Sequence, residues 1–99
     1  MHWNPSDHDR VVATSEAVAC EFGAGLALLH LKSNVYYSLN GVGAFVWEQI
    51  QEPRSILDIR GAVLARYNVE AERCKADVEG LLKGLTEAGL ARLHGEELV

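Results

Sequence analysis

The sequence is poor in the residues that mark several common classes of protein. It has only two cysteines, Cys20 and Cys74, and no CxxC pair, which favours reduced thiols over a disulfide or a zinc site. Its longest apolar run, around residues 26–29, is far shorter than the roughly 18–20 residues of a membrane-spanning helix. The first residues lack the basic and apolar stretches of a secretion signal, and we therefore expect a cytoplasmic protein without a membrane partner.

Basic residues are also in the minority. The chain has nine Lys and Arg residues and fourteen Asp and Glu residues, which gives a net charge of −5. A negative charge of this size is poorly suited to binding nucleic acid. The chain has 99 residues, of which 48% are hydrophobic, as expected for one globular domain. We expect this domain to span residues 1–99, with loose ends at residues 1–10 and 95–99.

The residue patterns of catalytic and metal sites are missing as well. The four histidines lie far apart in the sequence, whereas a zinc site needs clustered ligands. The stretch Asn40-Gly41-Val42-Gly43 lacks the lysine of a phosphate-binding loop, so close packing of a helix on a sheet explains its glycines better. His30 alternates with apolar neighbours and is assigned a structural role. These observations predict a protein that is not an enzyme and has no metal or cofactor.

Three segments in the first half have the pattern of β-strands. Residues 16–22 alternate between two faces, and residues 26–32 are more uniformly apolar, as in a central strand. Residues 35–39 are β-branched and aromatic. Gly23 and the pair Ser33-Asn34 suit short turns, because glycine and asparagine tolerate positive φ angles. The prediction is an antiparallel three-stranded meander whose first and third strands are edges.

Beyond these strands, apolar residues recur at three- and four-residue steps, which predicts three amphipathic helices. Asn40 caps the first helix and Pro53 ends it, while Ser55 caps the second. The third runs from about residue 71 to 88 and ends at Gly89-Leu90 in a Schellman motif, before a short strand at residues 91–93. The predicted buried residues are Val42, Phe45, Val46, Trp47, Ile50, Ile56, Ile59, Val63, Leu64, Tyr67, Cys74, Val78, Leu81, Leu82 and Leu85. The fold class is therefore α+β, with three strands followed by three helices.

Three features could indicate a binding surface. Tyr36 and Tyr37 place an aromatic ring on each face of the predicted edge strand, although each ring taken alone is better explained as an ordinary core or surface aromatic. Trp47 on the first predicted helix is a second candidate, but it is more typical of the core. Ala76, Gly80 and Gly84 form a stripe of small residues on the third helix, where glycine costs roughly 0.5–1 kcal/mol relative to alanine. The stripe allows either tight packing inside the domain or the close approach of another backbone.

The order of these residues resembles that of the PqqD family, whose members are small winged-helix-like proteins called RiPP recognition elements. The resemblance covers about residues 16–93. It rests on VYYSLNGVGAFVWEQI (35–50), Pro53, Ser55, Asp58-Ile59, Tyr67-Asn68-Val69, Asp77-Val78, Leu81-Leu82, Leu85 and Gly89-Leu90. Leu39-Asn40 with Gly43-Ala44 and Trp47, together with Cys74 and Asp77-Val78, most resemble the stand-alone leader-binding proteins of lasso-peptide biosynthesis.

This resemblance implies a non-catalytic adaptor that binds the leader of a ribosomally made precursor peptide and delivers it to other enzymes. In lasso pathways those partners are a leader peptidase and a cyclase. In the family the leader pairs as an extra strand with the third strand and lies against the third helix. The positions implied here are Val35, Tyr36, Tyr37, Ser38, Arg73, Cys74, Asp77, Val78 and Leu81. Arg73 and Lys75 would then be available to pair with acidic leader residues.

An alternative is a winged-helix DNA-binding regulator that reads DNA with its third helix. The charges of that helix argue against it, because an acidic helix repels phosphates. The acidic side chains Glu70, Glu72, Asp77, Glu79 and Glu87 outnumber the basic ones, which are Arg73, Lys75 and Lys83.

Overall fold

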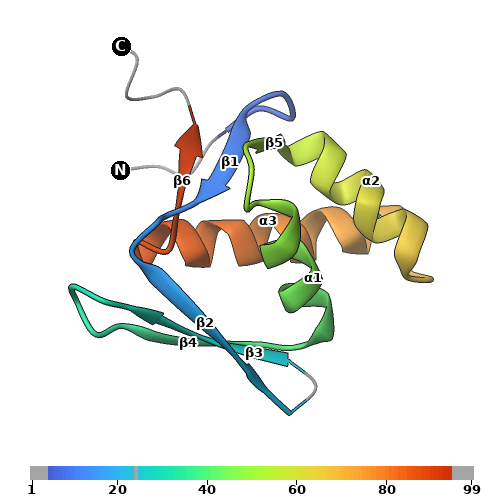
Figure 1. The fold of residues 1–99 in the computed structure, drawn as a ribbon. Coiled ribbons are helices and arrows are strands. Elements are labelled where there is room, and N and C mark those ends of the chain that lie inside the picture. The colour runs from blue at the N-terminus through green and yellow to red at the C-terminus, as the bar shows by residue number, and fades with distance from the viewer. Residues whose placement is uncertain (1–4, 24, 95–99) are drawn as a thin grey trace.

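The computed structural model describes residues 5–23 and 25–94 and shows an α+β fold (Figure 1). The elements are β1 (Arg10–Ala13), β2 (Ala17–Phe22), β3 (Gly25–His30), β4 (Tyr36–Leu39), α1 (Gly41–Gln49), β5 (Arg54–Ser55), α2 (Ile56–Arg66), α3 (Ala71–Glu87) and β6 (Ala91–His94). No helix in the described part of the chain is long and apolar enough to cross a lipid bilayer.

The predicted meander is present as the antiparallel sheet β2-β3-β4, with β3 in the centre. Val18, Leu29 and Tyr36 lie opposite one another in its register. Asn34 adopts a φ of 59° in the β3–β4 turn, which is the left-handed conformation expected of asparagine there. This turn starts earlier than predicted, because β3 ends at His30 and not at residue 32.

A second sheet, in the order β5-β1-β6, was only partly predicted. Residues 91–93 were expected as a strand, but β1 and β5 were not, so the simple order of three strands followed by three helices is incomplete. Val11 and Val12 in β1 are both buried, so this short strand shows no alternation of apolar and polar residues.

The expected loose arm is also corrected where it is described. Arg10 belongs to β1, and the Asp7 carboxylate accepts two hydrogen bonds of 3.0 Å from the Arg60 guanidinium. The backbone N–H groups of Leu57 and Ile56 donate to the carbonyl oxygens of Asp7 and Asp9, both at 3.0 Å. Residues 1–4 and 95–99 lie outside the described residues.

The helices begin and end close to the predicted positions. The Asn40 side chain accepts from the Gly43 N–H at 2.8 Å, and the Ser55 hydroxyl accepts from the Asp58 N–H at 3.0 Å, so both predicted N-caps are confirmed. After α3, the Leu90 N–H donates to the carbonyl of Leu85 at 2.9 Å, and Gly89 has a φ of 78°. This is the Schellman motif that the sequence predicted.

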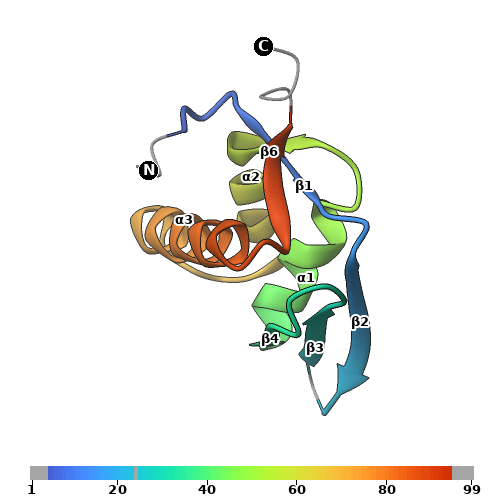
Figure 2. The same ribbon diagram turned by 90° about the vertical axis from the view of Figure 1, so that its left-hand side faces the viewer.

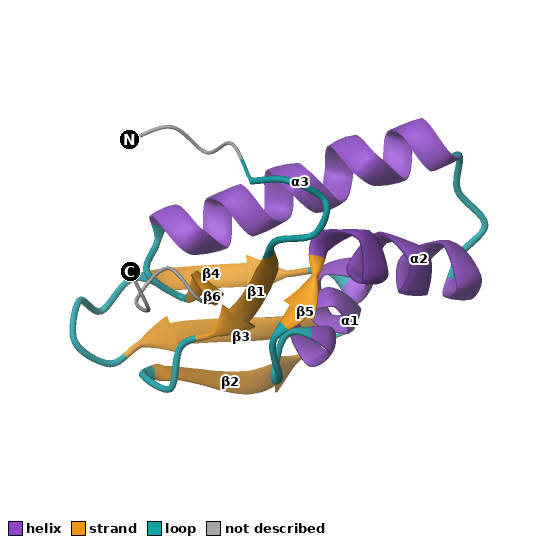
Figure 3. Ribbon diagram, turned by 90° about the horizontal axis from the view of Figure 1, so that it is seen from above, coloured by secondary structure: helices purple, strands orange, loops and turns teal. Residues whose placement is uncertain are grey.

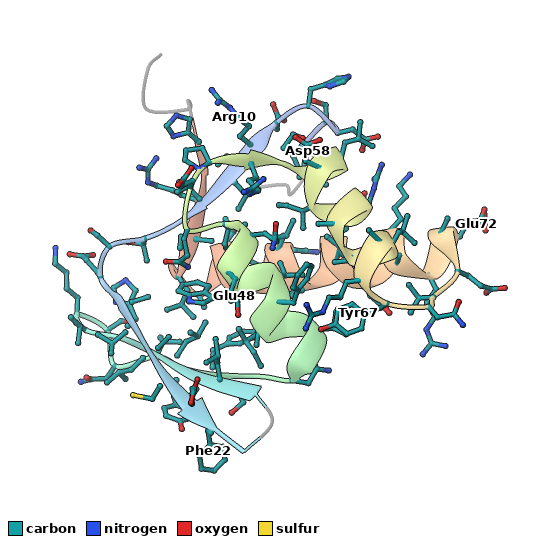
Figure 4. All side chains as sticks on the ribbon, turned by 45° about the vertical axis from the view of Figure 1, so that its right-hand side comes forward. Arg10, Phe22, Glu48, Asp58, Tyr67 and Glu72 are labelled. Atoms are coloured by element: carbon teal, nitrogen blue, oxygen red, sulfur yellow. The ribbon has the colours of Figure 1, made fainter. Side chains whose placement is uncertain are left out.

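The hydrophobic core lies between the two sheets and the three helices. Figure 2 shows this arrangement in a view close to the axis of α3. Leu28, Val46, Ile59 and Leu82 are fully buried, and Trp47 joins them as predicted. Leu64 was predicted in this core, but it is 39% exposed, because it lines an open cavity between α2 and the start of α3. The face of the β2-β3-β4 sheet turned away from the helices stays open, and Phe22 projects from it into solvent (Figure 4).

Candidate functional site

The free edge of β4 is the first part of the candidate site. β4 pairs with β3 on one side, and in the described part of the chain no strand pairs with its other side. Figure 3 shows α3 running alongside this strand. An edge strand of this kind presents unpaired backbone donors and acceptors to any extended segment that approaches.

The register decides which β4 backbone groups point outward. The His30 N–H donates to the Val35 carbonyl at 2.9 Å, so these two residues form a hydrogen-bonded pair. Such pairs alternate along an antiparallel ladder. Tyr37, opposite Leu28, therefore directs its N–H and C=O toward β3, while Tyr36 and Ser38 direct theirs away from the sheet. The free edge thus offers the backbone groups of Tyr36 and Ser38 to a ligand.

A groove of about 460 Å³ between β4, α1 and α3 is the second part of the site. Its lining is mostly apolar, and Asp77 is the charged residue among the described side chains that line it. The lining residues are Tyr37, Ser38, Leu39, Asn40, Val42, Gly43, Val46, Val63, Val69, Cys74, Asp77, Val78 and Leu81. An extended segment paired with β4 would therefore place alternate side chains in this groove.

Six of the nine predicted site residues line the groove: Tyr37, Ser38, Cys74, Asp77, Val78 and Leu81. The other three, Val35, Tyr36 and Arg73, do not. Tyr36 lies on the free edge and is 62% exposed, with its ring on the face of the sheet opposite to the groove. The Val35 carbonyl accepts a hydrogen bond from the His30 N–H. Arg73 is exposed on α3, with its Nε 3.7 Å from the Asp77 carboxylate.

Seven lining residues were not predicted. Leu39, Asn40, Val42, Gly43 and Val46 come from the end of β4 and the start of α1. The capped helix start at Asn40 was a signal for them, since it forces the first turn of α1 to sit at the end of β4. Val63 and Val69 approach the groove from α2 and from the α2–α3 connection. Helical spacing predicted that Val63 is buried, but no local pattern in the sequence places either residue at the groove.

Cys74 lies among the groove residues on α3 and is almost fully buried. Burial raises the pKa of its thiol, the positive charge of Arg60 opposes this effect, and the Asp77 carboxylate adds to it. Its Sγ lies 3.7 Å from the backbone carbonyl of Arg60, to which the thiol donates. A protonated, buried thiol of this kind suits packing and is a poor nucleophile.

Lys75 does not share the surface of Arg73. It lines a separate cavity of about 290 Å³, together with Leu57, Arg60 and Leu64 of α2. Residues two positions apart on a helix point in different directions, so the two basic side chains belong to opposite flanks of α3. Lys75 therefore does not line the groove beside β4, whereas Arg73 lies next to Asp77, which does.

The part of the chain that forms the edge strand and the groove matches a known protein family. Residues 25–91, which include β3, β4 and all three helices, match the family model described as coenzyme PQQ synthesis protein D (PqqD). The chain belongs to the PqqD family. The resemblance seen in the sequence is thereby confirmed, and the PqqD match contains all nine of the predicted site residues.

Two solved structures have the same fold as this PqqD-family chain. One, described as TbiB1 in complex with the TbiA(beta) leader peptide, is 26% identical, with a TM-score of 0.72 over 85% of this chain and 95% of that one. The other, described as lasso peptide synthetase B1 complexed with the leader peptide, is 24% identical, with a TM-score of 0.71 over 83% and 96%. No curated protein sequence matches this chain.

Proposed function

We propose that this protein is a non-catalytic adaptor that binds the leader of a ribosomally made precursor peptide and delivers it to processing enzymes. Membership of the PqqD family supports this function, as does the likeness to TbiB1, which was solved with a leader peptide. The enzymes served would be a leader peptidase and a cyclase, as in lasso-peptide biosynthesis. We further propose that the protein acts in the cytoplasm, as one domain, without a cofactor.

The observation that carries this proposal is the position of the free β4 edge beside an apolar groove. Strand addition to such an edge gives affinity through backbone hydrogen bonds and selectivity through alternate side chains. In the proposed complex, the leader bonds to the outward groups of Tyr36 and Ser38. Its inward side chains lie against Cys74, Val78 and Leu81.

We also propose that α2 and α3 form a helix-turn-helix like that of winged-helix proteins. In this protein the unit would bind a peptide and not DNA. The acidic side chains of α3 argue against a DNA-reading role, as does the net charge of −5. An electrophoretic shift assay with random duplex at low salt separates the two functions. The adaptor should give no shift under these conditions, whereas substantial binding would favour the regulator.

Proline substitution tests strand addition directly. Tyr36→Pro removes an outward N–H that β3 does not use, and the first residue of an edge strand tolerates proline. We expect this variant to keep its circular dichroism spectrum and melting temperature. It should nevertheless lose about tenfold or more of its affinity for a labelled leader peptide, measured by fluorescence polarisation. The peptide is taken from a precursor sought in the reading frames next to the gene.

Two further variants make this test specific. Tyr36→Ala keeps the N–H and removes only the ring, so it should bind the leader more tightly than Tyr36→Pro does. Tyr37→Pro removes an N–H that points toward β3 and should destabilise the fold. A well-folded Tyr36→Pro variant that binds the leader as tightly as the parent protein would rule out strand addition at this edge.

A further inference from the structure

His30 ends β3 and lies directly before the turn that leads into β4. Its side chain is only 12% exposed. The α3–β6 turn packs against the imidazole at Gly89, where an added Cβ would lie 3.5 Å from Nε2. The ring is therefore enclosed at the point where the chain reverses toward the free edge.

The hydrogen bonds of His30 hold this turn together. Its Nδ1 accepts from the backbone N–H groups of Lys32, at 3.2 Å, and Ser33, at 3.3 Å. Its own carbonyl accepts from the Asn34 N–H at 2.9 Å, and its N–H donates to the Val35 carbonyl at 2.9 Å. One residue thus bonds to four consecutive residues, and Tyr36 of the free edge follows immediately.

Both bonds to Nδ1 require an imidazole whose Nδ1 carries no proton. A neutral histidine can accept at one ring nitrogen, whereas a protonated histidine donates at both. Protonation of His30 would turn Nδ1 into a donor that faces two other donors. The two bonds would then be lost, and the turn would be held by the backbone bonds alone.

We propose that neutral His30 is a positioning residue for the leader-binding strand, and that its protonation loosens the β3–β4 turn and weakens leader binding. This inference rests on the proposed adaptor function. A loosened turn allows Val35 and Tyr36 more backbone conformations, and strand addition must then select one of them at an entropic cost. Acidification over the range in which imidazoles titrate should therefore weaken capture of the leader.

Two charged side chains lie near the His30 ring. The Glu16 carboxylate, which precedes β2, lies 3.8 Å from Nε2 and would attract a protonated ring. The same carboxylate also holds the Lys32 ammonium at 2.7 Å, which offsets that attraction. The α3–β6 turn contributes Gly89, which carries no charge.

Two substitutions separate the acceptor from the bulk of the side chain. In His30→Asn, the amide oxygen can take the place of Nδ1 and cannot be protonated in this pH range. In His30→Gln, the amide reaches the position of Nε2 and leaves no acceptor at Nδ1. The wild type and both variants are compared by NMR, from the exchange protection of the Lys32 and Ser33 amides at about pH 7.5 and about pH 5.5.

We expect wild-type protection of these two amides to be about threefold or more lower at about pH 5.5 than at about pH 7.5. His30→Asn should keep its protection at both pH values, and His30→Gln should lack it at both. Protection that does not follow the titration of the ring, or a ring that does not titrate over this range, would overturn the proposal.

The affinity of the three proteins for the same labelled leader peptide is then measured by fluorescence polarisation. It should fall about threefold or more with acidification for the wild type and stay constant for His30→Asn. Equal pH dependence in the two proteins would refute a positioning role for His30. A wild type that binds no leader even at about pH 7.5 would instead contradict the adaptor function, while the amide exchange would still report on the turn.

Discussion

Gly84 and Gly80 belong to the same stripe on α3, but the structure gives them different surroundings. A Cβ at Gly84 would lie 2.5 Å from the hydroxyl oxygen of Tyr37. At Gly80 an added Cβ would meet no atom within 4 Å. Packing inside the domain therefore explains Gly84, although its neighbour is a tyrosine of β4 and not another helix. Gly80 leaves open space on the exposed side of α3.

This difference predicts opposite effects of the same substitution. Gly84→Ala should lower the free energy of unfolding, because the Tyr37 ring must move. The double variant Gly84→Ala with Tyr37→Phe should recover that loss, since the next ring atom lies 3.5 Å away. Gly80→Ala should instead stabilise the protein by about 0.5–1 kcal/mol. Urea denaturation of the four proteins checks this, and no recovery in the double variant would contradict the assigned contact.

At the scale of the element, α3 serves two neighbours with its two flanks. Asp77 and Leu81 line the groove beside β4, while Lys75 and Glu79 face α2. Between them, Cys74, Val78, Leu82 and Leu85 fill the core. The helix thus anchors the domain through one stripe, while one flank lines the groove beside β4.

Arg73 and Lys75 provide a matched pair for testing this division. Arg73 is 77% exposed and already lies beside Asp77, so replacing it by alanine should weaken leader binding by no more than about fivefold. Lys75→Ala removes the same charge from the other flank and should leave the affinity unchanged. Fluorescence polarisation at low and high salt measures both. A larger effect at Lys75 than at Arg73 would place the leader on the flank of α3 that faces α2 and would contradict the proposed site.

At the scale of the whole molecule, Arg60 joins three distant parts of the chain. Its guanidinium bonds to the Asp7 carboxylate before β1 and lies 3.5 Å from the Glu79 carboxylate on α3. Its backbone carbonyl accepts from the Cys74 thiol beside the groove. The segment before β1 is thereby tied to α2 and α3, on the flank of α3 that faces away from the groove beside β4.

This connection predicts a dependence of stability on pH. The hydrogen bonds from Arg60 hold the pKa of Asp7 below its ordinary value of 3.8. A lowered pKa stabilises the folded state above the ordinary value, and this contribution disappears as the pH falls through the lowered pKa. Asp7→Asn should therefore melt at a lower temperature at neutral pH and lose less on acidification below about pH 4 than the wild type.

Differential scanning calorimetry across this range provides the measurement, with Glu87→Gln as an exposed carboxylate control on α3. Some acid sensitivity should remain in Asp7→Asn, because Lys32 also lowers the pKa of Glu16. Identical acid profiles for Asp7→Asn and the wild type would show that the Asp7–Arg60 pair does not contribute to stability.

The sequence by itself determined the elements whose signals are local. The caps at Asn40 and Ser55, the Schellman motif at Gly89 and the central position of β3 were all predicted and are all confirmed. Each depends on residues a few positions apart, whose side-chain geometry is the same in any fold. The PqqD family was likewise recognised from the order of residues and short motifs along the chain, and the family match confirms it.

Tertiary structure decided everything that depends on distant residues meeting. The pairing of β1 with β5 and β6, the outward direction of the Tyr36 backbone and the place of Val63 in the groove leave no local trace. A two-residue period states that Val18 and Ala17 lie on opposite faces, but not which face the helices cover. That choice arises from packing over long separations, and it placed Val18 in solvent and opened the β4 edge beside α3.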